Sequence, residues 1–172
     1  MAMVAIPMLT SGTIATSSDR AVATNLVEVT CNTQTSVPTV TATLSNQSSI
    51  ESEQNFQSTT ILSFLPQYFS SESALTNCQK TAASLQDYYN RDKMNYLASD
   101  TIDGKPVVCA VERRGIKCDG YSSEILFSLE HSVNPTTLLY DILGKDFKGS
   151  QVPSSRTVSR IYTDLRPIWW PF

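Results

Sequence analysis

The amino-acid sequence predicts an α+β protein in which a mainly antiparallel β-sheet packs on one long helix plus a short second helix, with two disulfides. Three observations predict this class. Short segments of alternating apolar and polar residues recur between turn-forming stretches, as in half-buried strands. One long segment near the middle of the chain repeats its apolar residues every three or four positions, as in a helix. Widely spaced cysteines that form no Cys-x-x-Cys pair favour disulfides over a zinc or thioredoxin-type centre.

The N-terminal half begins with three expected strands. In residues 25–32 (NLVEVTCN) apolar and polar residues alternate, and Cys31 shares a face with two valines, hence inward. Runs with β-branched residues at residues 38–44 and 59–65 are the next two strands. Residues 45–58 between them are polar and aperiodic, so we expect a loop or a long hairpin tip there.

The clearest expected element is a helix over residues 71–90. Ser70 or Ser71 can cap it, and Glu72 lies near the positive end of the helix dipole. The apolar residues of one face are Leu75, Cys78, Ala82, Leu85 and Tyr89. Because Cys78 lies in the middle of this stripe, burial of the helix against the sheet brings it to a cysteine on a strand.

The second half begins with an expected hairpin. Its strands cover residues 94–102 and 105–112 and join at Asp103-Gly104, a strong type I′ signal because both central residues need positive φ. A further reversal is expected at residues 113–115, followed by a strand over residues 122–130.

A short helix and a last strand complete the expected fold. Asn134 is the expected cap of the helix, Pro135 lies in its first turn, and Gly144 ends it. The expected core-facing residues are Leu138, Leu139, Ile142 and Leu143. The last strand is expected over residues 157–165.

The expected domain organisation has three parts. Residues 1–24 are a flexible lead-in or the remnant of a signal peptide, since they are apolar at the start but have no basic n-region. Residues 25–165 form a single α+β domain, and residues 166–172 are an aromatic C-terminal tail. No apolar run reaches the roughly 18 residues that span a bilayer, so no transmembrane segment of its own is expected.

Composition and charge exclude one class of partner. Serine and threonine make up roughly a quarter of the chain, against 17% charged residues, which suits β-structure with long loops. The formal net charge is -3, and the sequence has no basic stripe. Nucleic acid is therefore not an expected partner.

The cysteine spacing favours one of three possible pairings. Cys109 and Cys118 flank the reversal at residues 113–115, so a bridge between them is geometrically easy, and Cys31 with Cys78 then joins the first strand to the long helix. In the chain-entropy model the two bridges contribute about 2.7 and about 4 kcal/mol. The sequence leaves the two other pairings open, as well as four free thiols in a reducing compartment.

From Cys31 to about Asp164 the order of landmarks resembles a cyanobacterial family, the circadian oscillating proteins. The resemblance covers about three quarters of the chain. Its landmarks are Cys31, the helix with Cys78, Tyr88 and Tyr89, the segments 94–97 and 102–109, Gly115 to Cys118, the segment 125–129, Asn134-Pro135 and the segment 160–164. The N-terminal segment departs from the family pattern, because it lacks the basic start of a signal peptide.

The resemblance implies a compartment and a kind of partner. Members look exported and peripherally associated with membranes, so it implies the periplasm or the thylakoid lumen and a membrane-protein complex or membrane-surface partner. Their abundance follows the day–night cycle in some cyanobacteria. The resemblance carries over no activity, cofactor or catalytic residue. We therefore expect a non-enzymatic, membrane-peripheral structural or protein-interaction domain of unknown function.

Two sequence features are candidates for contact with a partner. The tail contains Trp169, Trp170 and Phe172, and tryptophans dominate binding hot spots, although a tail folded back over the sheet explains them equally well. Arg113 and Arg114 lie at the tip of an expected turn, where they can meet anionic lipid or a partner protein.

The alternative functions are a hydrolase of unrecognised type and a carrier of a small apolar ligand. A hydrolase would use His131, but the sequence has no nucleophile-elbow motif. The carboxylates near expected turns, Glu112, Asp119 and Glu124, are a weak basis for glycoside hydrolysis, and Asp100, Asp103 and Glu112 lack the spacing of a calcium loop. A carrier needs an apolar cleft between sheet and helix. No catalytic, cofactor-binding or metal-binding residue is predicted.

Overall fold

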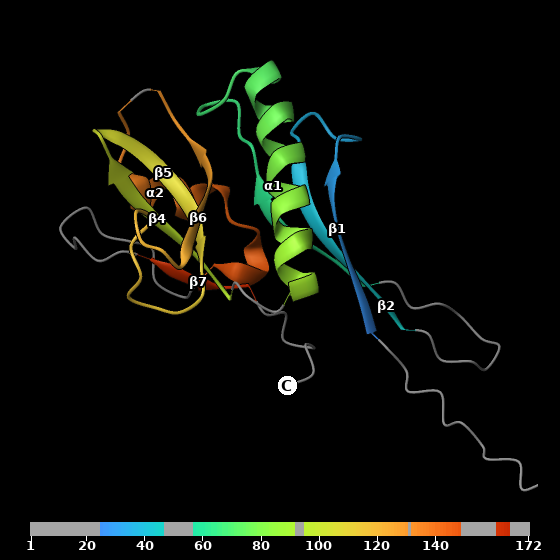
Figure 1. Ribbon diagram of the computed structural model, residues 1–172. Helices are drawn as coiled ribbons and strands as arrows, with labels where there is room; N and C mark the ends of the chain where they lie inside the picture. The colour runs from blue at the N-terminus through green and yellow to red at the C-terminus, as the bar shows by residue number, and fades with distance from the viewer. Residues whose placement is uncertain (1–24, 47–56, 92–94, 131, 149–160, 166–172) are drawn as a thin grey trace, which may run out of the picture.

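The computed structural model describes residues 25–46, 57–91, 95–130, 132–148 and 161–165. Within these residues, seven strands form two antiparallel sheets, and two α-helices and one 3₁₀ helix complete the fold (Figure 1). The α+β class and the mainly antiparallel pairing are therefore confirmed. The strands divide between two sheets, one from each half of the sequence, because both hairpin regions pair locally.

The first sheet has one buried and one polar face. Its strands, in the order β1-β2-β3, are β1 (Asn25–Asn32), β2 (Thr39–Asn46) and β3 (Gln57–Ser63). Val27 and Val29 are buried, whereas Glu28 and Thr30, which alternate with them, are exposed, as the sequence pattern predicts. The hydroxyl groups of Thr30 and Thr41 lie 3.4 Å apart on the polar face, which also includes Glu28.

Helix α1 (Ser71–Arg91) confirms the expected long helix with one shift of its buried face. Its buried residues are Ala74, Cys78, Thr81, Ala82, Leu85 and Tyr88. The expectation that Leu75 faces the core is wrong, since this side chain is 40% exposed. Ala74 is buried in place of Leu75 in the first turn, and near the other end Tyr88 is buried whereas Tyr89 is half-buried. The hydroxyl of Ser70 accepts a hydrogen bond from the Ser73 amide and caps the helix.

The second sheet is built around a strand that is buried on both faces. In the order β6-β5-β4-β7 it contains β4 (Tyr96–Ile102), β5 (Lys105–Val111), β6 (Ser123–Ser128) and β7 (Tyr162–Asp164). Asp103 and Gly104 both have positive φ, as the type I′ turn requires. Every residue of β5 after Lys105 is buried, which explains why its sequence does not alternate.

Helix α2 (Pro135–Ile142) begins as expected but ends for a different reason. The Asn134 side chain accepts hydrogen bonds from the amides of Thr136 and Thr137 and caps it. Gly144, expected as a left-handed helix end, has a φ of −62°. A Cβ atom there would lie 1.8 Å from the Thr60 carbonyl oxygen, so glycine is needed for the close approach to β3. The 3₁₀ helix η1 (Lys145–Phe147) follows.

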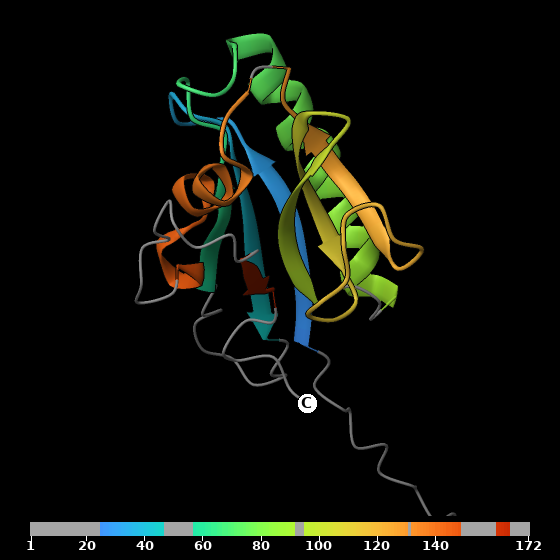
Figure 2. The same ribbon diagram turned by 90° about the vertical axis from the view of Figure 1, so that its left-hand side faces the viewer.

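The two helices lie on opposite sides of the two sheets (Figure 2). Helix α1 packs on β1, β2 and β6, and α2 packs on β4 and β5. Between them lies the main core, which includes three phenyl rings, Phe64, Phe69 and Phe127, in edge-to-face contact at 5.1–5.6 Å between centroids. Within the described part of the chain, no helix is long and apolar enough to cross a membrane.

Most strand boundaries differ from expectation by one or two residues. Strand β2 extends to Asn46 and β3 starts at Gln57, so the ends of the loop expected over residues 45–58 are strand, and β6 is shorter than the expected 122–130. Strand β3 ends at Ser63 rather than residue 65, because β2 starts at Thr39 and offers no further partner; the Phe64 amide bonds to Pro38 instead. Strand β7 is short, since its pairing with β4 covers Tyr162–Asp164. The expected strand residues 157–160 lie outside the described residues, as do the lead-in 1–24, the loop residues 47–56 and the tail 166–172.

Candidate functional site

The structure forms the two disulfides that the cysteine spacing favours. Cys31 bonds to Cys78 and joins β1 to α1, with 5.6 Å between the Cα atoms. Cys109 bonds to Cys118, only nine positions further along the chain, and also has 5.6 Å between the Cα atoms. No described cysteine is free.

The Cys109–Cys118 bond fixes the segment that connects β5 to β6, residues 112–122, which we call the pinned loop. The Tyr162 hydroxyl donates a hydrogen bond to the Ile116 carbonyl at 3.1 Å, and the Ser123 hydroxyl lies 2.9 Å from the Cys118 carbonyl oxygen. Gly115 makes the expected reversal with a φ of 94°, which glycine adopts without strain. The loop is therefore held to the sheet at several points along its length.

A small apolar cluster lies beneath the pinned loop, on the face of the second sheet away from the main core. Its buried members are Ala98, Val107, Cys109, Val111 and Cys118. Tyr96, Ile102, Ile116 and Tyr162 pack around them. The loop therefore covers the second face of β5 and packs on this apolar cluster.

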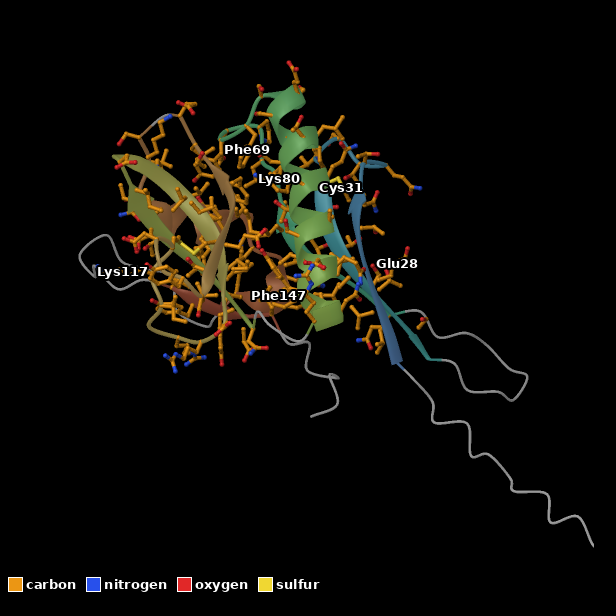
Figure 3. All side chains as sticks on the ribbon, viewed as in Figure 1. Glu28, Cys31, Phe69, Lys80, Lys117 and Phe147 are labelled. Atoms are coloured by element: carbon orange, nitrogen blue, oxygen red, sulfur yellow. A yellow bond between two sulfur atoms is a disulfide. The ribbon has the colours of Figure 1, made fainter. Side chains whose placement is uncertain are left out.

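The pinned loop presents cations and an aromatic side chain to solvent. Arg113, Arg114 and Lys117 are exposed, and among the described residues none of the three forms an ion pair. The Arg114 guanidinium lies 5.4 Å from the centre of the Tyr96 ring, a cation–π contact. Tyr121 is fully exposed. Lys117 lies on the far side of the molecule from Cys31 (Figure 3).

The base of the pinned loop lies next to the point from which the aromatic tail departs. The Asn95 amide donates to the Val111 carbonyl, and its side chain donates to the Glu112 carbonyl. The Asn95 carbonyl in turn accepts from the Leu165 amide at 2.8 Å. The two features expected to contact a partner thus start from neighbouring backbone positions, although Trp169, Trp170 and Phe172 themselves lie outside the described residues.

Tyrosines connect the end of α1 to this region. The Tyr89 hydroxyl donates to the Leu165 carbonyl at 2.7 Å. Burial is the main cause that raises the pKa of Tyr89 above its usual range, and the Asp164 carboxylate raises it further. Burial likewise raises the pKa of Tyr88, with a further contribution from Glu124 of β6. Both phenols therefore stay protonated well above neutral pH.

The carboxylates considered for catalysis lie in or next to the pinned loop at exposed positions. His131 lies outside the described residues. Glu112, Asp119 and Glu124 are exposed. The described ranges contain no group of three or more histidine, cysteine or acidic residues with metal-ligand geometry. The interface between α1 and the first sheet, where an apolar ligand would need a cleft, is packed with buried side chains such as Leu85.

Sequence reasoning missed Lys117 and Tyr121 as members of the exposed surface. Tyr121 stands between Gly120 and two serines, and an aromatic residue in so polar a turn is a signal that we could have used. Lys117 adds a third cation beside the two arginines. The contact between Arg114 and Tyr96 joins positions eighteen apart and has no signal in the sequence.

Comparison with known proteins supports the resemblance seen in the sequence. The family model described as circadian oscillating protein COP23 matches residues 28–169, which is most of the chain. No curated protein and no solved structure matches the chain.

Proposed function

The chain belongs to the circadian oscillating protein COP23 family, and we propose that it is a non-enzymatic, extracytoplasmic interaction domain that lies at the periphery of a membrane. The observation that carries this proposal is the pinned loop, which presents three exposed cations and a fully exposed tyrosine on a backbone fixed by a disulfide. A loop whose backbone is fixed before binding loses less conformational entropy on binding.

The chemistry of the pinned loop favours an anionic membrane surface or a membrane complex with an acidic face. Its three cations outnumber the carboxylates of Glu112 and Asp119 in the same loop. A cation near an anionic lipid surface contributes about 1 kcal/mol to binding. Tyr121 adds an amphipathic ring of the kind found at membrane–water interfaces.

Two disulfides support the proposal of an extracytoplasmic compartment. Disulfides persist in oxidising compartments and are rare in the cytosol of mesophiles. One of them joins elements 47 positions apart and the other holds the pinned loop, so both contribute to the folded state. The periplasm and the thylakoid lumen both fit this reasoning.

The first test is a non-reducing peptide map by mass spectrometry of protein from its native membrane fraction. The expected result is both bridges, a processed N-terminus and release from the membrane by high salt, because salt screens exposed charges. Four free thiols together with an intact Met1 would contradict the extracytoplasmic proposal.

The second test measures binding to vesicles with and without anionic lipid. Arg113→Ala/Arg114→Ala is expected to weaken binding to anionic vesicles roughly 30-fold, from about 1 kcal/mol for each cation. The charge-matched control is Lys80→Ala/Lys145→Ala, which removes two exposed cations outside the pinned loop. Binding to native membranes but not to anionic vesicles would identify a membrane protein as the partner. An effect of the control equal to that of the arginine variant would overturn the role of the loop.

A further inference from the structure

The two disulfides differ in how far solvent reaches them. Cys109 and Cys118 are 0% and 3% exposed, so both ends of that bridge are enclosed beneath the pinned loop. Cys78 is also completely buried, but its partner Cys31 is half-buried at the edge of the first sheet. Thiol–disulfide exchange requires a thiolate to reach a sulfur atom, so access separates the two bridges.

Cys31 packs against the main core but is only partly buried. Cys31 is the last but one residue of β1, an edge strand, and the exposed residues 33–36 follow it. Its side chain lies between β1 and α1 at the side of the molecule (Figure 3). Because the Gln86 side chain occupies the edge of β1 at Val27 and Val29, the approach to Cys31 lies at the end of the strand, beside the exposed residues 33–36.

The bridge holds one half of α1, while other contacts hold the other half. Towards the C-terminal end, the Gln86 side chain accepts from the Val29 amide at 2.6 Å and donates to the Val27 carbonyl at 3.2 Å. The Tyr89 hydroxyl bonds to the Leu165 carbonyl. Towards the N-terminal end, the tie from α1 to β1 is the bond from Cys78 to Cys31.

The N-terminal half of α1 also contains a buried group that favours opening. The Thr81 hydroxyl is completely buried and has no hydrogen-bond partner among the described residues. An unpaired buried hydroxyl destabilises the closed state, and it regains hydrogen bonds to water when the segment opens. Because the hydrogen bonds of Gln86 and Tyr89 still hold the C-terminal half, we expect the helix to open from its N-terminal end first once the disulfide is broken.

We propose that Cys31 is a thiol–disulfide exchange site, at which a Cys-x-x-Cys dithiol reduces the Cys31–Cys78 bridge and releases the N-terminal half of α1 from β1. The reductant's thiolate attacks the Cys31 sulfur, a mixed disulfide forms, and Cys78 leaves as a thiolate that takes up a proton. The second thiol of the reductant then attacks the mixed disulfide and releases Cys31. Two electrons and two protons pass to the protein, and the reductant is left as its own disulfide.

The test measures the reduction rate of each bridge in the native, full-length protein. Dithiothreitol is the probe, and alkylation followed by mass spectrometry locates the free thiols over time. The Cys31–Cys78 bridge is expected to be reduced at least about tenfold faster than Cys109–Cys118, which serves as the control within the same molecule. Equal rates, or faster reduction of Cys109–Cys118, would overturn the proposal.

Low concentrations of urea distinguish exchange in the folded protein from exchange after global unfolding. The reduction rate of Cys31–Cys78 is expected to stay constant, whereas that of Cys109–Cys118 rises with urea along with the unfolded population. A parallel rise for both bridges would show that Cys31 reacts only in unfolded chains and would remove the exchange site.

Hydrogen exchange tests the release of the helix. After selective reduction, amides of residues 74–81 are expected to exchange roughly ten times faster, while those of residues 85–91 keep their protection. Cys31→Ala/Cys78→Ala is expected to reproduce this pattern, and Cys109→Ala/Cys118→Ala is not. Should the first variant fail to fold, the selectively reduced wild type still gives the answer; unchanged protection there would contradict the release.

Discussion

The two sheets of this protein are stabilised in different ways. The first sheet is completed by distant segments: α1 reaches the edge of β1 through Gln86 and the Cys31–Cys78 bond, and Gly144 reaches β3. In the second sheet the strand β7 also comes from a distant segment, but the outer face of β5 is covered locally, because the pinned loop folds back over it and is closed by a disulfide between positions nine apart. The comparison shows that a small α+β fold can combine a long-range disulfide at one sheet with a short-range disulfide at the other.

Removing the disulfides one at a time is expected to give the largest effect. Cys31→Ala/Cys78→Ala should lower the free energy of unfolding by about 4 kcal/mol, and Cys109→Ala/Cys118→Ala by about 2.7 kcal/mol. The reason is the sequence separation of the bonded positions, 47 against 9, which sets the entropy gained by the unfolded chain. Urea unfolding followed by circular dichroism measures both losses. Equal losses would remove the distinction between long-range and short-range closure.

Glycine is favoured at positions 144 and 115 for different reasons, a close contact at the first and a positive φ at the second. Gly144→Ala is expected to cost about 3 kcal/mol, because the new Cβ would lie 1.8 Å from the Thr60 carbonyl oxygen. Gly115→Ala in the pinned loop has open space and only the strain of positive φ, about 1 kcal/mol.

Asparagine at the same two positions sharpens this test. Because asparagine tolerates positive φ, Gly115→Asn should be nearly neutral, whereas Gly144→Asn should cost as much as alanine. Thermal unfolding of the four variants measures the difference. Recovery of stability by asparagine at position 144 would show that conformation, rather than the contact with β3, requires glycine there.

A third comparison uses two glutamines of helix α1, one bonded to the edge of β1 and one exposed. Gln86→Leu is expected to lower the free energy of unfolding by about 2 kcal/mol, since it leaves the Val29 amide and the Val27 carbonyl without their side-chain partner. The control Gln79→Leu replaces an exposed glutamine of the same helix and should change stability by less than about 0.5 kcal/mol. Equal effects of the two variants in urea unfolding would rule out edge pairing as the cause.

Alkaline pH tests the contacts between α1 and the second sheet. Since the pKa values of Tyr88 and Tyr89 are raised in the folded state, their contribution is fully present below pH ~10, the ordinary tyrosine value. Above it the unfolded chain loses protons that the folded chain keeps, so stability falls by up to about 1.4 kcal/mol per pH unit for each phenol, or about 2.7 kcal/mol per unit for the pair. Urea unfolding between pH 8 and 11 measures this slope. Tyr88→Phe/Tyr89→Phe should flatten it, and an unchanged slope would exclude these phenols as its source.

The sequence was sufficient for those features that depend on neighbours along the chain. The type I′ turn at Asp103-Gly104 and the Asn134 cap follow from residues within one turn, and both are confirmed. The favoured disulfide pairing is also confirmed, because Cys109 and Cys118 flank a reversal that the sequence marks. For the candidate surface, the two arginines were found but Tyr121 and the Tyr96 contact were not.

What the sequence by itself determined is the class of fold, the positions of its main elements and the covalent framework, since periodicity, turn residues and cysteine spacing act over short distances. Only the tertiary structure decided the division into two sheets, the outward turn of Leu75, the close approach that requires Gly144 and the burial of β5 on both faces. These features depend on the atoms that a distant segment brings to each position. The local sequence pattern does not specify which atoms those are.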